Sequence, residues 1–216
     1  CAHGTQYVNT WIHTGMVQVD KEKMSKSLGN FFTVKDVLAE YNRESVRYFL
    51  ISSHYRSQLN YSAENLLQAH AALGRLYTAL RGVTPATTVD LDNDYVRQFN
   101  AAMDDDFNTA LALPVLFDLA REINKAKTDD AGKAAELAAL LINLGEILGV
   151  LQGDAESFLQ AGGSDGDVAE IEALIASRNA ARAAKDWAAA DAARAALTAK
   201  NIIVEDKNGV TSWRRG

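Results

Sequence analysis

Apolar residues recur with helical spacing over much of the chain. After Ser62 they fall every three or four positions, which would place them on one helix face: Leu66, Ala69, Leu73, Leu76 and Leu80. Arg81-Gly82 is a typical helix end, because glycine readily adopts a left-handed conformation. Similar spacing predicts helices at about 92–104, 109–127 and 131–152, the last with Leu137, Leu141, Leu144, Leu148 and Leu151 on one side. Their short connections favour an antiparallel helix bundle.

The residues before this bundle predict extended structure, a loop and two short helices. Residues 6–19 alternate well enough for extended structure and lead into a charged loop at 21–30. Thr33 can cap a helix that has Asp36 in its first turn. A second helix is expected from Asn42 to Ser52, with Val46, Phe49 and Leu50 facing inward. Pro114 lacks an N–H, so we expect it to kink the 109–127 helix or delay its start.

The last part of the chain predicts a small α+β unit. Residues 161–167 form a glycine-rich linker, followed by alanine-rich helices at about 168–184 and 187–199. Two short apolar runs then read as strands, Ile202-Ile203-Val204 and Val210-Thr211-Ser212-Trp213. Asn208-Gly209 between them is a favourable hairpin turn. The predicted fold is therefore mainly α.

Composition and charge narrow the class of protein. The single cysteine, Cys1, excludes an internal disulfide and a site built from several thiolates, so we expect a reducing, cytoplasmic setting. The sequence has no long uninterrupted apolar run, so we expect no membrane span. The net charge is −6, but residues 21–61 carry +3, residues 178–216 carry +4 and residues 62–177 carry −12. Both basic regions could attract phosphate, or they could be ordinary solvated faces. The start at Cys1 indicates a piece of a longer protein or a processed terminus.

The loop Lys23-Met24-Ser25-Lys26-Ser27 carries candidate chemistry. Two lysines three apart, with hydroxyls beside them, suit a reaction in which negative charge moves onto a leaving pyrophosphate, because mobile ammonium groups then stabilise the transition state. Met24 can anchor the loop by packing. The alternative is a basic surface turn.

These letters match the KMSKS motif of class I aminoacyl-tRNA synthetases. Three longer strings resemble bacterial cysteinyl-tRNA synthetases: residues 15–32, residues 54–61 (His-Tyr-Arg-Ser-Gln-Leu-Asn-Tyr) and residues 103–109 (Met-Asp-Asp-Asp-Phe-Asn-Thr). The resemblance implies ATP binding by Lys23, Met24, Ser25, Lys26 and Ser27, with Lys23 and Lys26 catalytic. It also implies three parts: a remnant of the class I catalytic domain (1–61), a helix-bundle tRNA-binding domain (62–161) and an anticodon-reading domain (162–216).

The same resemblance implies that part of the active site lies outside this chain. The family's HIGH-type ATP motif is missing, and its zinc ligands lie upstream. The resemblance therefore implies ATP with Mg²⁺ as cofactor, and zinc in the parent enzyme with ligands outside this chain. Cys1 and His3 are expected to be structural. His13, His54 and His70 lack metal-ligand spacing, so no metal site is predicted here.

Near the end of the chain, two predicted helices carry residue types that suit RNA recognition. Trp187, Asp191 and Arg194 are spaced by four and three, so they share a face, and Arg178 and Arg182 lie one turn apart. An aromatic ring can stack on an unpaired base while charged groups bind its edge. Trp187 could instead be core, and Asp191 with Arg194 a surface ion pair.

Carried over from the family, five residues would contact the anticodon GCA: Arg182, Trp187, Asp191, Arg194 and Asp206. Arg75 and Arg81 are candidates for contact with the tRNA stem. We therefore expect part of a monomeric ligase that joins cysteine to tRNA(Cys) using ATP. The alternatives are a non-catalytic tRNA-binding module and a related ligase of mycothiol synthesis, which lacks an anticodon-reading unit.

Overall fold

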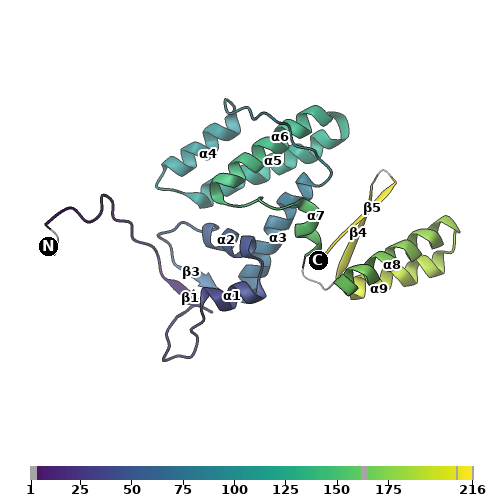
Figure 1. Cartoon of the computed structure of the whole chain (residues 1–216), viewed down its shortest axis with the longest axis horizontal. Coiled ribbons are helices and arrows are strands. Elements are labelled where there is room, and N and C mark those ends of the chain that lie inside the picture. Colours follow the sequence, from purple (N-terminus) through teal and green to yellow (C-terminus); the bar gives the residue numbers. More distant parts are fainter. Residues whose placement is uncertain (1–3, 162–164, 208, 216) are drawn as a thin grey trace. The chain divides into compact units, whose positions relative to one another are not determined.

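The computed structural model describes residues 4–161, 165–207 and 209–215. The chain forms two compact units, Cys1–Leu76 with Val83–Gln152, and Tyr77–Gly82 with Gly153–Gly216. Helices dominate both, as the sequence predicts (Figure 1). The domain boundaries at 61/62 and 161/162 stay a prediction. The interpretations of Cys1 and His3 concern residues outside the described ranges.

A small three-stranded sheet carries the loop of the first unit. Strands β1 (Val17–Val19), β2 (Glu22–Lys23) and β3 (Leu59–Tyr61) lie in the order β2-β1-β3. β1 and β2 are antiparallel, joined by Asp20 and Lys21 with φ of 48° and 68°, a conformation typical of two-residue hairpin turns. β1 and β3 pair in parallel. Extended structure before the loop is thus confirmed for β1, whereas its partner strand β3 was not predicted.

Two short helices follow the loop where the sequence predicts them. Helix α1 (Val34–Glu40) begins with a capping box between Thr33 and Asp36. Helix α2 (Arg43–Ile51) lies between the cap residues Asn42 and Ser52. The inward position of Leu50 is wrong, because this side chain is 52% exposed. The inward position of Phe49 is confirmed, and it shares the buried face with Ser45 and Tyr48. Leu50, the next residue along the helix, turns away from that face.

The longer helices confirm the leucine patterns. They are α3 (Ala63–Leu80), α4 (Asp94–Asp104), α5 (Thr109–Asp129) and α6 (Ala131–Leu148). The five apolar residues of the α3 stripe, Leu66, Ala69, Leu73, Leu76 and Leu80, are all buried. Only Asp130 separates α5 from α6, so these two helices run antiparallel and pack together (Figure 1).

Two details of the bundle differ from the predictions. Helix α5 starts at Thr109, capped by the Asn108 side chain, and Pro114 lies inside it, so the proline does not delay the start. Helix α6 stops at Leu148 rather than near 152, because Gly149 turns left-handed with φ of 69°. Leu151 is buried, but it lies beyond the helix.

The second unit combines helices with a hairpin. Helix α7 (Ala155–Gln160) was not predicted, whereas α8 (Asp165–Ala183) and α9 (Trp187–Ala199) correspond to the two alanine-rich segments. Strands β4 (Ile202–Lys207) and β5 (Val210–Arg215) are antiparallel. The two helices α8 and α9 and the two strands share one hydrophobic core, which consists of Ile171, Ile175, Leu197, Ile202 and Trp213. Part of the predicted linker (162–164) and Asn208 of the predicted turn lie outside the described residues. For residues 165–167 the linker prediction is wrong, because helix α8 already begins at Asp165.

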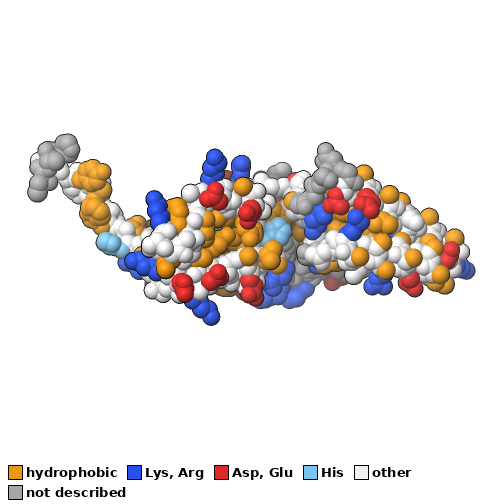
Figure 2. Space-filling view, turned by 90° about the horizontal axis from the view of Figure 1, so that it is seen from below, with side chains coloured by type: hydrophobic (Ala, Val, Ile, Leu, Met, Phe, Trp, Pro, Cys, Tyr) orange, Lys and Arg blue, Asp and Glu red, His pale blue; other side chains and the backbone are white. Residues whose placement is uncertain are grey.

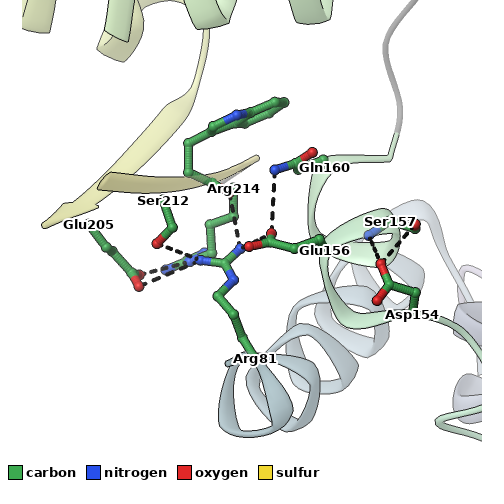
Figure 3. A network of polar contacts seen from close by, with 9 residues as sticks. Arg81, Asp154, Glu156, Ser157, Gln160, Glu205, Ser212 and Arg214 are labelled. Atoms are coloured by element: carbon green, nitrogen blue, oxygen red, sulfur yellow. Dashed lines mark hydrogen bonds and ion pairs between the residues drawn. The ribbon is translucent and has the colours of Figure 1, made fainter. Parts of the chain in front are cut away.

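Arg81 organises part of this second unit (Figure 3). Its guanidinium lies 3.2 Å from Glu156 and 3.8 Å from Glu205, and it donates hydrogen bonds to the Ser212 hydroxyl and the Trp213 carbonyl. Only 11% of the side chain is exposed. Arg81 as a basic contact for a tRNA stem is therefore a wrong prediction, since its charge is engaged by two carboxylates. Arg75, by contrast, is exposed and lies 4.9 Å from the Phe117 ring centroid.

Candidate functional site

The loop at 21–30 is closed by a few local hydrogen bonds. The Ser25 amide donates to the Asn30 side-chain oxygen at 2.8 Å, and the Asn30 side-chain nitrogen donates to the Lys23 carbonyl at 3.2 Å. The Gly29 amide donates to the Lys26 carbonyl at 3.3 Å, with Gly29 at φ 69°. Asn30 thus holds the first half of the motif, from Lys23 to Ser25, and Gly29 provides a left-handed turn just after its last residue.

Both lysines of this loop leave their charge available to a ligand. Lys23 and Lys26 are exposed, and neither forms an ion pair within the described part of the chain. The Lys26 ammonium lies 5.4 Å from the centroid of the Phe31 ring. The Ser25 and Ser27 hydroxyls lie 3.2 Å apart, and Met24 is half-buried. The loop therefore offers two mobile cations and two hydroxyls, a combination that suits phosphate oxygens.

The base of the loop is held by the segment around β3. The Lys21 amide donates to the Asn60 side chain at 2.6 Å, and the Asp20 amide to the Tyr61 carbonyl at 3.1 Å. The Gly15 amide donates to the Tyr55 carbonyl at 2.8 Å. The two backbone segments lie so close here that a Cβ on Gly15 would be 1.9 Å from the Ser57 carbonyl oxygen. The two sequence segments 15–32 and 54–61 therefore pack directly against each other in the fold.

The third string, 103–109, joins the same cluster through Asp106. Its carboxylate accepts hydrogen bonds from Tyr55 Oη and Arg56 Nε, both at 2.6 Å, and lies 3.8 Å from His54 Nε2. The hydrogen bond from Arg56, followed by that from Tyr55, lowers the pKa of Asp106 to about 2. Thr109 donates from its hydroxyl to the Ile51 carbonyl at 2.7 Å. This cluster ties the start of α5 to the segment that supports the loop.

The N-terminal segment of the first unit exposes apolar side chains. Tyr7, Trp11 and Ile12 are 87%, 73% and 53% exposed. Figure 2 shows hydrophobic side chains along this N-terminal segment. Ile12 also lines a hollow of about 200 Å³ with Leu50, Ile51 and Phe107.

The second unit contains a cleft between α8, α9 and β4. It has a volume of about 570 Å³, and its walls carry charged, aromatic and aliphatic side chains. All five residues predicted to contact bases line this α8–α9–β4 cleft: Arg182, Trp187, Asp191, Arg194 and Asp206. Arg178, which the sequence places one turn before Arg182, lines it as well.

On one side of the cleft, the arginines converge on Asp206. Arg178 approaches both of its carboxylate oxygens, at 2.5 and 3.2 Å, Arg182 pairs with the same carboxylate, and the Thr211 hydroxyl donates to it at 2.8 Å. These hydrogen bonds, from Arg178 first and then Thr211, hold the pKa of Asp206 well below its usual range. Asp206 is therefore ionised and tightly held at neutral pH.

On the other side, the side chains remain open to a ligand. Trp187 is 63% exposed at the start of α9, so a core position for this tryptophan is wrong. Asp191 and Arg194 are both exposed, and no ion pair joins them in the described residues. Ala190, three residues after Trp187, is small and buried, and it lines the cleft as well. The cleft thus pairs a stacking surface with an unneutralised carboxylate and guanidinium.

The remaining histidines give no metal site. His70 lies 2.8 Å from the hydroxyl of buried Ser45, and burial lowers its pKa. No group of three or more potential ligands is close enough to hold a metal ion among the residues the structure describes. Among the same residues, no helix is both long and apolar enough to cross a membrane.

Comparison with protein-family models gives three matches in order along the chain. Residues 1–71 match the class I (C) tRNA synthetase catalytic domain, residues 98–152 the DALR domain, and residues 165–214 the cysteinyl-tRNA ligase anticodon-binding domain. Together with the KMSKS loop and the fold, they define a class I aminoacyl-tRNA synthetase sequence.

Comparison with curated proteins identifies the family within that class. The chain is 65% identical to a cysteine–tRNA ligase of Haemophilus influenzae, 63% to that of Pseudoalteromonas translucida and 61% to that of Aliivibrio fischeri. Each match covers 100% of this chain and 47% of the relative. The chain belongs to the cysteine–tRNA ligase family and spans about half the length of these curated relatives.

Proposed function

We propose that the chain is the part of a cysteine–tRNA ligase that supplies the KMSKS loop and the anticodon contacts. The ligase would activate cysteine with ATP and transfer it to tRNA(Cys). The observation that carries this proposal is the α8–α9–β4 cleft, where all five residues carried over from the family line one hollow. An ordinary solvated face would not gather an exposed tryptophan with unpaired charges of both signs.

In the proposed ATP step, the loop acts through charge. Lys23 and Lys26 have no acidic partner among the described residues, so their ammonium groups are available to the phosphates of ATP. Negative charge on the leaving pyrophosphate grows as the adenylate forms, and mobile cations stabilise that state more than the bound substrate. Ser25 and Ser27 would donate hydrogen bonds, and Mg²⁺ would accompany ATP. The described residues do not fit the family's zinc site, so no step is assigned to zinc here.

In the proposed recognition step, the cleft binds unpaired bases of the anticodon. Trp187 would stack on one base, and its exposed ring needs no rearrangement to do so. Asp191 would accept from a base edge that presents N–H donors, while Arg182 and Arg194 would donate to acceptors. The anticodon GCA follows from the family resemblance. A cytoplasmic, monomeric ligase remains our expectation.

The α8–α9–β4 cleft favours one second candidate, a non-catalytic RNA-binding module. Every contact proposed for RNA bases lies in residues 182–206, within the second unit. By itself, the chain would bind an anticodon hairpin without forming an adenylate. The mycothiol-pathway alternative lacks an anticodon-reading unit and is not favoured by the match at 165–214.

The test uses this chain alone and a ligase in which it is joined to the amino-terminal portion of the Haemophilus influenzae relative. We expect cysteine-dependent ATP–pyrophosphate exchange from the joined ligase and none from the chain alone. We expect both to bind a hairpin RNA that presents GCA in its loop. Exchange with another amino acid but not with cysteine would overturn the proposed ligase activity.

A further inference from the structure

Arg178 differs from the other charged residues of the cleft in its burial and in its bonding. Its side chain is 12% exposed, compared with 46% for Arg182, although both pair with Asp206. It uses two nitrogens for the two oxygens of that carboxylate, and one of them also lies 2.9 Å from the Asn179 side-chain oxygen. Such a two-point contact fixes the plane of both groups.

The acceptor positions of Asp206 are filled by protein donors. A carboxylate has about four such positions. Oδ1 accepts from Arg178 and from Thr211, and Oδ2 accepts from Arg178 and from Arg182. Thr211 is itself held by Asn179, whose side-chain nitrogen donates to its hydroxyl at 3.0 Å. Asp206 therefore has one orientation, set mainly by Arg178 and Thr211, which are less exposed than Arg182.

Arg182 is the exposed end of this chain of contacts. It gives a single nitrogen to Asp206, and a guanidinium has five N–H donors in a rigid plane. In the described part of the chain no other side chain binds it, so its remaining donors are available to a ligand. The direction of these Arg182 donors depends on the orientation of the Asp206 carboxylate. That orientation in turn depends on Arg178.

We propose that Arg178 is a positioning residue for anticodon recognition, which holds Asp206 and through it fixes the plane in which Arg182 presents its donors to an unpaired base. This inference rests on the proposed function. It assigns a role to an arginine that is largely buried and that gives three hydrogen bonds to Asp206 and Asn179. Lysine cannot replace it, since a single ammonium group cannot bind both oxygens in one plane.

The experiment is a double-mutant cycle on the full chain, with Arg178→Met, Arg182→Met and both together. Affinity is measured by fluorescence anisotropy for a hairpin RNA with GCA in its loop and for three hairpins, each with one anticodon base substituted. We expect Arg178→Met to lower discrimination about tenfold, at the same base as Arg182→Met, because a well-placed pair of hydrogen bonds acts in this range. In the Arg182→Met background, Arg178→Met should change discrimination less than twofold.

Arg215→Met is the matched control. Arg215 is also an ion-paired arginine of this unit, 2.6 Å from Asp167 and 21% exposed, but it does not line the cleft. It should weaken binding of all four RNAs alike and leave their ratios unchanged. Thermal unfolding by circular dichroism identifies variants that fail to fold, and Arg178→Lys, which keeps the charge, should still lose discrimination.

The outcomes separate this inference from the proposed function. If the unchanged chain binds the GCA hairpin no better than the substituted ones, the proposed anticodon reading fails. If it discriminates but Arg178→Met and Arg178→Lys discriminate equally well, the positioning role is overturned. A loss that is as large in the Arg182→Met background as in the unchanged chain also overturns it, since Arg178 would then act independently of Arg182.

Discussion

The KMSKS loop and the α8–α9–β4 cleft present positive charge in opposite ways. In the loop, Lys23 and Lys26 are exposed, and neither has a carboxylate partner among the described residues. In the cleft, Arg178 and Arg182 are both held by Asp206. The loop therefore offers mobile point charges on flexible stems, whereas the cleft offers planar groups in fixed directions.

This difference would suit the two proposed ligands. Charge that moves during a reaction is best met by cations that can follow it, and lysine provides this. A base edge has fixed donors and acceptors, so recognition benefits from groups that are already oriented and lose little entropy on binding. The experiments with Gly15, the two lysines and Trp187 each change one region and also measure the other.

The largest effect is expected where the support of the loop is most crowded, at Gly15. In Gly15→Ala, the new Cβ would lie 1.9 Å from the Ser57 carbonyl oxygen, and backbone cannot move aside cheaply. The pairing of β1 with β3 should be lost, and the first unit should be destabilised by about 3 kcal/mol or more. Denaturant unfolding measures this, and the affinity of the cleft for GCA hairpin RNA should stay within twofold.

Gly29→Ala is the control for that experiment. Nothing lies within 4 Å of a Cβ at Gly29, but its φ is 69°. The cost is then left-handed strain alone, about 1 kcal/mol. Equal destabilisation by the two substitutions would contradict the crowding argument at Gly15.

The next effect concerns the lysines themselves. In the joined ligase, Lys23→Ala or Lys26→Ala should lower cysteine-dependent ATP–pyrophosphate exchange about 10²-fold, the usual consequence of removing one group that stabilises transition-state charge. Binding of GCA hairpin RNA should not change. Lys35→Ala, an exposed lysine in the first turn of α1, is the control and should leave exchange intact. A similar loss in Lys35→Ala would mean that the general positive field, not the loop, assists the reaction.

Helical periodicity predicted most of the fold because it is a local property. Leu66, Leu73 and Leu76 needed only their spacing to be placed in the core, and Thr33 with Asp36 needed only their separation to be placed at a helix start. Strand β3 was missed for the opposite reason. Its pairing with β1 joins residues about forty positions apart, and three residues carry too little pattern to reveal a partner.

The candidate site shows the same limit. The shared face of Trp187, Asp191 and Arg194 follows from spacing, and the structure places all three along one cleft. The role of Arg178 does not follow from spacing, because it depends on Asp206 and Thr211 from the β4–β5 hairpin. The pattern Arg178-Asn179-x-x-Arg182, with an acidic residue in the following strand, was the only available signal. The environment of Arg81 could not be predicted for the same reason, since its partners Glu156 and Glu205 are far from it in sequence.

A smaller effect should come from the open side of the cleft. In Trp187→Ala, loss of the stacking surface should weaken binding of GCA hairpin RNA at least about tenfold, since stacking of one base contributes about 1–3 kcal/mol. ATP–pyrophosphate exchange by the joined ligase should be spared, because the substitution leaves the KMSKS loop unchanged. Trp187→Phe retains an aromatic face and should recover most of the affinity. Equal loss of binding and exchange would indicate a folding role for the tryptophan.

The smallest effect is a pH dependence in the support of the loop. The pKa of Asp106 is lowered to about 2 by the hydrogen bonds from Arg56 and Tyr55, in that order, so the folded chain favours its ionised form. What this carboxylate adds to stability is therefore complete above its ordinary pKa of 3.8, and it is lost as the pH falls from about 4 to about 2. The change should be small, because the group is exposed and water screens its ion pair.

The measurement is unfolding of the chain between pH 5 and pH 2, compared with Asp106→Asn, together with a carboxyl NMR titration of Asp106 itself. The variant should lack the part of the pH dependence that Asp106 contributes, and Asp105→Asn, the neighbouring acid, should retain it. A titration of Asp106 near its ordinary value would contradict the cluster with Tyr55 and Arg56. The supports of the two regions would then differ in kind, because Asp206 would remain a carboxylate fixed by arginine while Asp106 would be a solvated one.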